Sequence, residues 1–281
     1  MVRPPVVDWP FFAYGIFRPG QLAFFQLREL VIDVVYPAEI AGCLLLRDGL
    51  PILDPSGDGH VRGALLTFSP VRAGEAYDRV SAMEPDKHYL WSEVKIDGMP
   101  ANILVGRSPR KGSVPCESEE WNSWDDPLFT AALEVVEETL ESQSFQWDLK
   151  PLFRLQMAYL LLWTSIERYV SLRYHLGDKV TEKIACLAGE AAFVQGLVRH
   201  VRERREVYRA DRPADKKVLD PQSSKKALDY YYQVRSNVTH RGKGVVRDHE
   251  RVEMSIRELL PIFREALAAA KRDAHYSGLR S

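Results

Sequence analysis

The sequence predicts an α+β fold, in which a small mixed β-barrel is followed by an all-α helical bundle. Short apolar runs separated by turn residues fill residues 11–107, and from Pro127 onward the apolar period becomes helical. The charge balance also changes sign. Residues 1–149 carry 12 Lys and Arg against 23 Asp and Glu, whereas residues 150–281 carry 26 against 16. A chain of 281 residues is long enough for two modest domains.

The first half is predicted to consist of strands joined by turns. Strands are expected at 11–14, 40–46, 61–68, 89–96 and 101–105, and short helical segments at 21–30 and 75–83. Asp97-Gly98 indicates a hairpin turn, and the segment 54–59 has turn chemistry as well. Many short strands with few helices favour a small barrel or a strongly bent sheet.

The second half is predicted to be helical. Helices are expected at 127–141, 152–176, 181–208, 248–272 and from Ser223 into the segment 235–240, with a charged loop at 209–222. Asp126 is expected to cap the first of them, because Pro127 suits a first helical position. The expected domains are 1–108 and 127–281, joined by a polar connector at 109–126.

Composition excludes several classes of protein. There is no charged and apolar leader with a cleavage site, and the apolar run from Leu155 to Trp163 is too short for a membrane span. The three cysteines are far apart and odd in number, which indicates a reducing compartment. No histidine spacing suits zinc, and no Gly-rich loop suits a nucleotide cofactor. We therefore expect a cytoplasmic protein with no membrane association, cofactor or metal.

The segment Arg235-Ser236-Asn237-Val238-Thr239-His240 carries the residues needed to cut RNA without a metal. Arginine clamps phosphate oxygens, and histidine transfers protons near neutral pH. His240 would act as base or acid while Arg235 steadies the charge on the phosphate. Further phosphate contacts are expected from a set of nearby polar and basic residues: Asn237, Thr239, Arg241, Lys243, Lys225 and Lys226. One histidine serves both proton transfers poorly, so we expect a symmetric dimer.

This segment resembles the RxxxxH signature of the HEPN superfamily, many of whose members are ribonucleases. The segment from Trp163 to Tyr169 is similar to the early HEPN helix that brings polar groups to the motif. The resemblance covers roughly residues 127–272. It implies a helical bundle, a homodimer with facing motifs and metal-independent cleavage of RNA by Arg235 and His240. The basic run 199–217 has two interpretations, a phosphate-tracking surface or a solvated helix face.

A second motif, Tyr14-Gly15-Ile16-Phe17-Arg18-Pro19-Gly20, ends the first strand in a turn whose backbone N–H groups are free to bind a carboxylate or phosphate. Further along the chain, Glu84 follows a short helix and precedes Tyr89. A partly buried glutamate there would move a proton while an amine attacks an amide.

Four pieces of this half resemble the γ-glutamylcyclotransferase and AIG2-like superfamily. They are the turn from Tyr14 to Gly20, Gly42-Cys43-Leu44, Val61-Arg62-Gly63-Ala64-Leu65, and Glu84 with Tyr89. The resemblance covers about residues 10–107. It implies a small mixed barrel in which Glu84 is the acid and base of a reaction that gives 5-oxoproline. It also implies that the ligand lies against six residues: Tyr14, Gly15, Ile16, Phe17, Gly20 and Tyr89.

The sequence thus favours a HEPN-type endoribonuclease that binds RNA and is regulated by a cyclotransferase-like domain binding a small γ-glutamyl or anionic ligand. Two alternatives remain open. One is a γ-glutamylcyclotransferase whose helical half serves dimerisation. The other is a non-catalytic scaffold.

Overall fold

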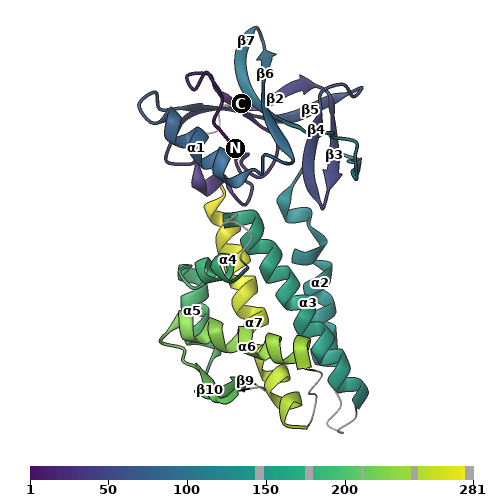
Figure 1. Ribbon diagram of the computed structural model, residues 1–281, viewed down its shortest axis with the longest axis vertical. Helices are drawn as coiled ribbons and strands as arrows, with labels where there is room; N and C mark the ends of the chain where they lie inside the picture. The colour runs from purple at the N-terminus through teal and green to yellow at the C-terminus, as the bar shows by residue number, and fades with distance from the viewer. Residues whose placement is uncertain (143–148, 175–179, 210–211, 242–245, 276–281) are drawn as a thin grey trace. The chain divides into compact units, whose positions relative to one another are not determined.

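The protein is described here from a computed structural model, which covers residues 1–142, 149–174, 180–209, 212–241 and 246–275. The fold is α+β, with an N-terminal sheet region and C-terminal helices (Figure 1). By their packing the residues divide into two compact units. The first unit comprises Met1–Asp126 together with the chain from Ala270 onward, and the second unit is Pro127–Ala269.

The first unit is built on a five-stranded sheet with the order β2-β5-β1-β7-β6. Its strands are β1 (Phe11–Ala13), β2 (Val31–Ala41), β5 (His60–Phe68), β6 (Tyr89–Ile96) and β7 (Met99–Gly106). Neighbouring strands are antiparallel except for β1 and β7, which are parallel. The expected hairpin is confirmed, since Asp97 and Gly98 form its two-residue turn with φ values of 50° and 82°.

A second, three-stranded sheet has the order β4-β3-β8, from β3 (Cys43–Arg47), β4 (Leu50–Asp54) and β8 (Val114–Pro115). The expected strand 40–46 is wrong, because Gly42 adopts φ 135° and separates the long strand β2 from β3. The expected helical segment 21–30 is reduced to one 3-10 turn, η1 (Phe24–Gln26). A further 3-10 turn, η2 (Ser123–Asp125), lies in the connector.

Helix α1 (Ala73–Met83) supplies the apolar core of the first unit and ends at Glu84. Its buried face carries Ala76, Tyr77 and Val80. The ring of Tyr77 meets Phe68 edge-on at 5.3 Å between centroids and Trp91 at 5.4 Å. Glu84 closes the helix, because its N–H donates to Val80 O at 3.0 Å and its own backbone is extended.

The second unit is mainly helical. Its helices are η3 (Pro127–Phe129), α2 (Ala131–Glu141), α3 (Leu149–Tyr174), α4 (Val180–Leu187), α5 (Ala191–His200), α6 (Ser224–Arg241) and α7 (Val246–Asp273), the last four residues of which belong to the first unit. A helical turn begins at Pro127 as expected, directly after Asp126, but it does not continue as one helix to residue 141. Pro127 opens a short 3-10 turn, and α2 starts only after Thr130.

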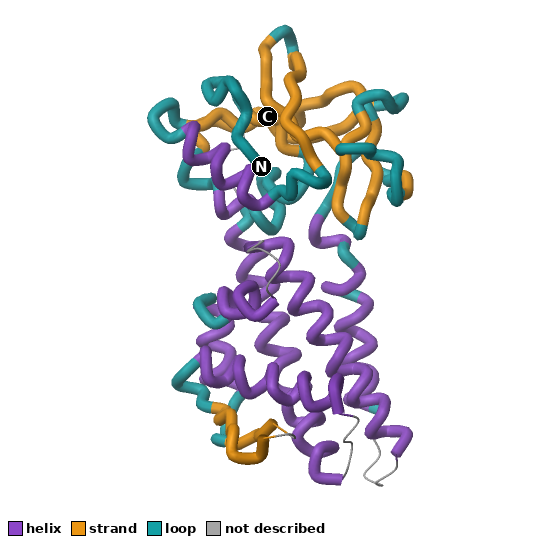
Figure 2. The backbone as a smooth tube through the Cα atoms, viewed as in Figure 1, coloured by secondary structure: helices purple, strands orange, loops and turns teal. Residues whose placement is uncertain are grey.

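The expectation of an all-α second half is wrong, because two strands between α5 and α6 pair antiparallel. They are β9 (Arg205–Arg209) and β10 (Arg212–Leu219), shown among the helices in Figure 2. The expected helix 181–208 is divided into α4, α5 and β9. Val207 is buried between exposed Glu206 and Tyr208, which is the alternation of a strand. The basic run 199–217 is therefore not a single helix face.

Gly20 is hydrogen-bonded to both segments of the chain that link the first unit to the second, the connector and the end of α7. Its carbonyl oxygen accepts from Trp124 Nε1 at 2.7 Å, and its N–H donates to Ala274 O at 2.8 Å. Asp273 O also accepts from Arg28 Nη1 at 3.1 Å. These bonds attach the connector and the end of α7 to the rest of the first unit. None of the described helices is long and apolar enough to cross a bilayer.

Candidate functional site

Glu84, Tyr14 and Tyr89 come together in the first unit, from the end of α1, the end of β1 and the start of β6. Burial is the main cause of a raised pKa in both tyrosines, and the nearby charge of Glu84 raises each pKa further. An interaction of this kind requires that the Glu84 carboxyl lie close to both phenol rings. The three residues singled out from separate parts of the sequence thus share one site.

Glu84 is a weak acid at this site. The residue is half-buried, and burial raises the pKa of its carboxyl from 4.5 to about 8. No hydrogen-bond partner for the carboxyl is found among the described residues. At pH 7 the group is therefore mostly protonated, and its pKa lies near the value of about 8 that is typical of an α-ammonium group.

The two tyrosine hydroxyls are bonded to the backbone. Tyr14 Oη donates to Leu104 O at 2.8 Å and accepts from Leu53 N at 3.4 Å. Tyr89 Oη donates to Pro51 O at 3.1 Å. With raised pKa values and these partners, both phenols stay neutral and hold the strands around Glu84 in place. Glu84 is consequently the group of the three that can exchange a proton.

The turn after β1 offers backbone donors. In the described part of the chain, no acceptor is found for the N–H groups of Gly15, Ile16 and Phe17. The side chains of Ile16 and Phe17 are buried, at 8% and 2% exposure, so these residues can reach a ligand only through their backbone. Gly20 differs, because its N–H and C=O are both bonded within the first unit. Free N–H groups in a turn favour an anionic or carbonyl oxygen.

Arg235 lies on α6 beside α3 in the second unit. Its Nη2 is 3.2 Å from Glu167 Oε1, and its guanidinium lies over the Tyr232 ring at 5.6 Å from the centroid. Burial raises the pKa of Glu167, while the positive charge of Arg235 opposes that rise. Arg235 Nε is buried and has no hydrogen-bond partner among the described residues, so the guanidinium keeps a donor for an anion.

The neighbouring polar residues of α6 have structural partners. Asn237 Nδ2 donates to Tyr208 O at 3.0 Å, and Asn237 Oδ1 accepts from Gln233 Nε2 at 2.9 Å. The amide thus connects α6 to β9 and is already bonded on both sides. Thr239 Oγ1 donates to Arg235 O at 3.0 Å, one helical turn back, on the exposed side of the helix.

Other residues predicted to contact phosphate lie further away or outside the described part. His240 and Arg241 belong to α6, but their side chains are outside the described residues, and so is Lys243. Lys225 and Lys226 are exposed in the first turn of α6. Lys225 is ten residues from Arg235, which is roughly 15 Å along a helix. These lysines would therefore meet phosphates some distance from Arg235.

Glu167 is a residue of the site to which the sequence assigned no role. Its segment was compared with the early HEPN helix, but only the structure pairs Glu167 with Arg235. Among the described residues no group of three or more metal-binding side chains is found. No protein-family model, no curated protein and no solved structure matches this chain.

Proposed function

We propose that the first unit is an acid–base catalyst of the γ-glutamylcyclotransferase type, which releases 5-oxoproline from a γ-glutamyl amide. The observation that carries the proposal is Glu84, whose carboxyl has a pKa raised to about 8 and whose charge acts on two tyrosines with hydroxyls bonded elsewhere. The proposal includes the finer fold expected from sequence, in which the five-stranded sheet is part of a small mixed barrel.

The chemistry needs one group that takes and returns a proton. Glu84 as carboxylate removes a proton from the substrate α-ammonium, and the amine nitrogen then attacks the γ-carbonyl carbon. The ring C–N bond forms, Glu84 returns the proton to the amide nitrogen, and the amide C–N bond breaks. Glu84 then takes the remaining extra proton from the ring nitrogen and passes it to the released amine, which leaves as an ammonium. The raised pKa of Glu84 makes its carboxylate a stronger base, closer in basicity to the substrate amine, which favours both transfers. The N–H groups of Gly15, Ile16 and Phe17 would hold the substrate carboxylate or the developing oxyanion.

A panel of γ-glutamyl dipeptides tests this function, with 5-oxoproline as the measured product. Glu84→Gln keeps the shape of the side chain and removes its proton, so we expect turnover to fall by about 100-fold or more. Glu75→Gln is the matched control on the same helix, because Glu75 lies on the surface beside Arg72. Failure of the wild-type protein to turn over any γ-glutamyl donor would defeat the proposal, as would full activity in Glu84→Gln.

For the second unit, the contact of Arg235 with Glu167 favours a further function, metal-independent endoribonuclease activity. Glu167 orients the arginine by an ion pair, and the free Nε leaves a donor for a phosphate oxygen. Arg235 and His240 are five positions apart on α6, which is a rotation of about 140° around the helix. The resemblance to HEPN domains implies that a second copy of the chain completes such a site.

RNA incubated in EDTA tests this second function, with 2′,3′-cyclic phosphate ends as the product. We expect Arg235→Ala and His240→Ala each to lower cleavage by about 100-fold or more. Arg257→Ala is the control, since Arg257 is an exposed arginine of α7 paired with Glu253. Cleavage that is absent in the wild type, or equal in all variants, would rule out the ribonuclease.

Mixing the two inactive variants tests the composite site. If each site takes residues from two chains, Arg235→Ala and His240→Ala subunits mixed together should regain activity that neither has alone. Light scattering at micromolar concentration should show a dimer. A monomer that still cleaves RNA would contradict the facing-motif arrangement while leaving the ribonuclease intact.

A further inference from the structure

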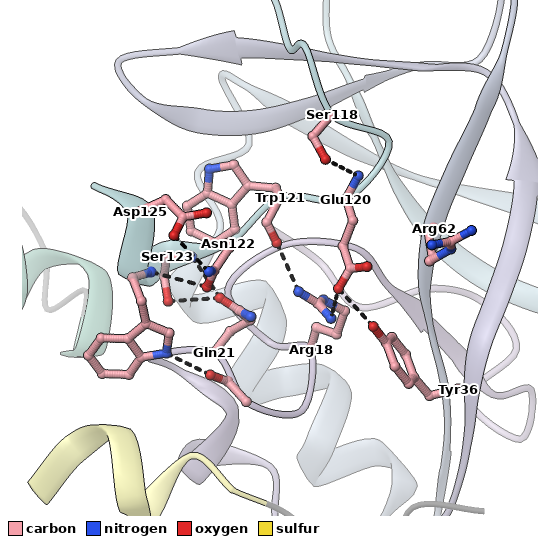
Figure 3. Close-up of polar contacts among 12 residues, drawn as sticks. Arg18, Gln21, Tyr36, Arg62, Ser118, Glu120, Trp121, Asn122, Ser123 and Asp125 are labelled. Carbon is pink, nitrogen blue, oxygen red and sulfur yellow. Dashed lines mark hydrogen bonds and ion pairs between the residues drawn. The ribbon is translucent and has the colours of Figure 1, made fainter. Parts of the chain in front are cut away.

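The first unit contains a cavity of about 580 Å³ that is separate from the Glu84 site. Its lining comes from the turn that follows β1, from β2, from the connector and from the end of α7 with the residues just after it. The lining residues are Arg18, Pro19, Gly20, Gln21, Tyr36, Ser118, Glu120, Asn122, Trp124, Lys271 and His275. Figure 3 shows the polar contacts around Arg18, Gln21 and Glu120. The volume lies in the range typical of small-molecule sites, and none of Tyr14, Glu84 and Tyr89 contributes to the lining.

Arg18 is the enclosed cation of this cavity, with 5% of its surface exposed. Its Nη2 donates to Trp121 O at 2.9 Å, and its Nη1 forms an ion pair with Glu120. Tyr36 lies under the guanidinium at 5.6 Å and donates its hydroxyl to Glu120 Oε1 at 2.8 Å. Arg18 Nε is buried and has no hydrogen-bond partner among the described residues. A buried cation with a spare donor favours an anionic ligand.

The remaining charges of the cavity add to this preference. Lys271 and His275 are exposed residues at the end of α7, and Lys271 Nζ lies 5.8 Å from the centre of a Trp124 ring. Glu120 is the one carboxylate among the lining residues. Two permanent cations and a histidine thus face a single carboxylate, which leaves the cavity positive. A phosphate monoester, with three terminal oxygens and up to two negative charges, satisfies several such donors better than a carboxylate does.

We propose that this cavity binds a small organic phosphate, whose phosphate group contacts Arg18 and Lys271 and competes with Glu120 for the arginine. The ligand would be held within the first unit, at the turn where Gly20 is bonded to both Trp124 and Ala274. The site is independent of the chemistry at Glu84.

Calorimetric titration of the full chain at low salt tests the proposal, with AMP and inorganic phosphate as probes, adenosine as the neutral control and acetate as the carboxylate control. We expect AMP and phosphate to bind, and adenosine not to bind. Lys271→Gln should weaken AMP binding about tenfold, whereas Lys95→Gln, at an exposed lysine of β6 that does not line the cavity, should not change it. Added salt should weaken binding as well.

Glu120→Gln is the sharpest variant, because it removes the anion that competes for Arg18. We expect it to bind AMP about three- to tenfold more tightly than the wild type, even though it loses an ion pair and folds less stably. If the Arg18–Glu120 pair had only a structural role, Glu120→Gln would lower the stability of the protein without raising its affinity for AMP. Glu84→Gln should bind AMP like the wild type, so failure of this site and failure of the cyclotransferase proposal are distinguishable.

Three results would overturn the proposal. The first is no binding of AMP or phosphate at 10 mM, a concentration on the order of the weakest specific affinities. The second is unchanged AMP affinity in both Lys271→Gln and Glu120→Gln. The third is acetate binding at least as tightly as inorganic phosphate, which would assign the cavity to carboxylates instead.

Discussion

Glu84 is the residue in which burial and chemistry are most directly connected. Its folded-state pKa of about 8 lies above the ordinary 4.5, so between these values the folded chain binds more protons than the unfolded chain. Stability should therefore fall as pH rises from about 4.5 through 8, by up to about 1.4 kcal/mol per pH unit. Chemical denaturation at several pH values measures this slope.

Glu84→Gln should flatten the pH dependence of stability in this window. Glu75→Gln supplies a contrast of opposite sign, because hydrogen bonding to Arg72 lowers the pKa of Glu75 and its contribution is lost only as pH falls. A wild-type stability that does not change between pH 5 and 8 would contradict the raised pKa.

At the scale of the elements, the contact of β5 with β1 explains the glycine in Val61-Arg62-Gly63. A Cβ added at Gly63 would lie 2.6 Å from Ala13 O and 2.7 Å from Phe12 Cζ. Both atoms are buried, and one is backbone, so neither can move easily. We expect Gly63→Ala to lower the free energy of unfolding by about 2–4 kcal/mol, measured by urea denaturation.

Gly74→Ala is the matched control for this substitution. Gly74 lies in the first turn of α1, and its added Cβ would meet only the end of the Arg3 side chain, which can move. There the substitution should stabilise the protein by about 0.5–1 kcal/mol, because alanine favours helix over glycine. Equal effects at the two positions would show that packing against β1 is not the cause.

At the scale of the whole molecule, the first unit is made from both ends of the described chain. Ala270 and Ala274 are each 1% exposed, and Ala274 O accepts the N–H of Gly20. A chain that ends after Ala269 should therefore show faster hydrogen exchange at the Gly20 amide and a less stable first unit. A chain that ends after His275 keeps these contacts and is the control. Unchanged exchange at Gly20 in the shorter chain would contradict this role.

We expect each unit to carry out its own proposed reaction. Glu84 belongs to the first unit and Arg235 to the second, so each proposed activity has its own residues. The connector and α7 link the two units along the chain. Trp124 in the connector and Ala274, directly after α7, are both hydrogen-bonded to Gly20. A phosphate bound in the cavity beside Gly20 would touch these two segments of the chain.

Several features were determined by the sequence itself. The hairpin at Asp97-Gly98, the strand 61–68 and the helices α1, α3, α6 and α7 follow from local pattern and turn chemistry, and the structure has all of them. Glu84 and Tyr89 were singled out from their spacing, and Tyr14 from its turn motif. Local interactions decide such elements, because apolar periodicity and the backbone freedom of glycine act over a few residues.

Other features were decided only by tertiary structure. The strands β9 and β10 form in a charged segment because Val207 and Leu219 are buried and Tyr208 O binds Asn237 of α6. The pKa of Glu84 depends on which residues surround it, and the pairing of Arg235 with Glu167 joins positions 68 residues apart. The cavity beside Arg18 combines a turn near the start of the chain with a helix near its end. Burial, charge pairing and cavities depend on contacts between distant segments, and such contacts exist only once the chain has folded.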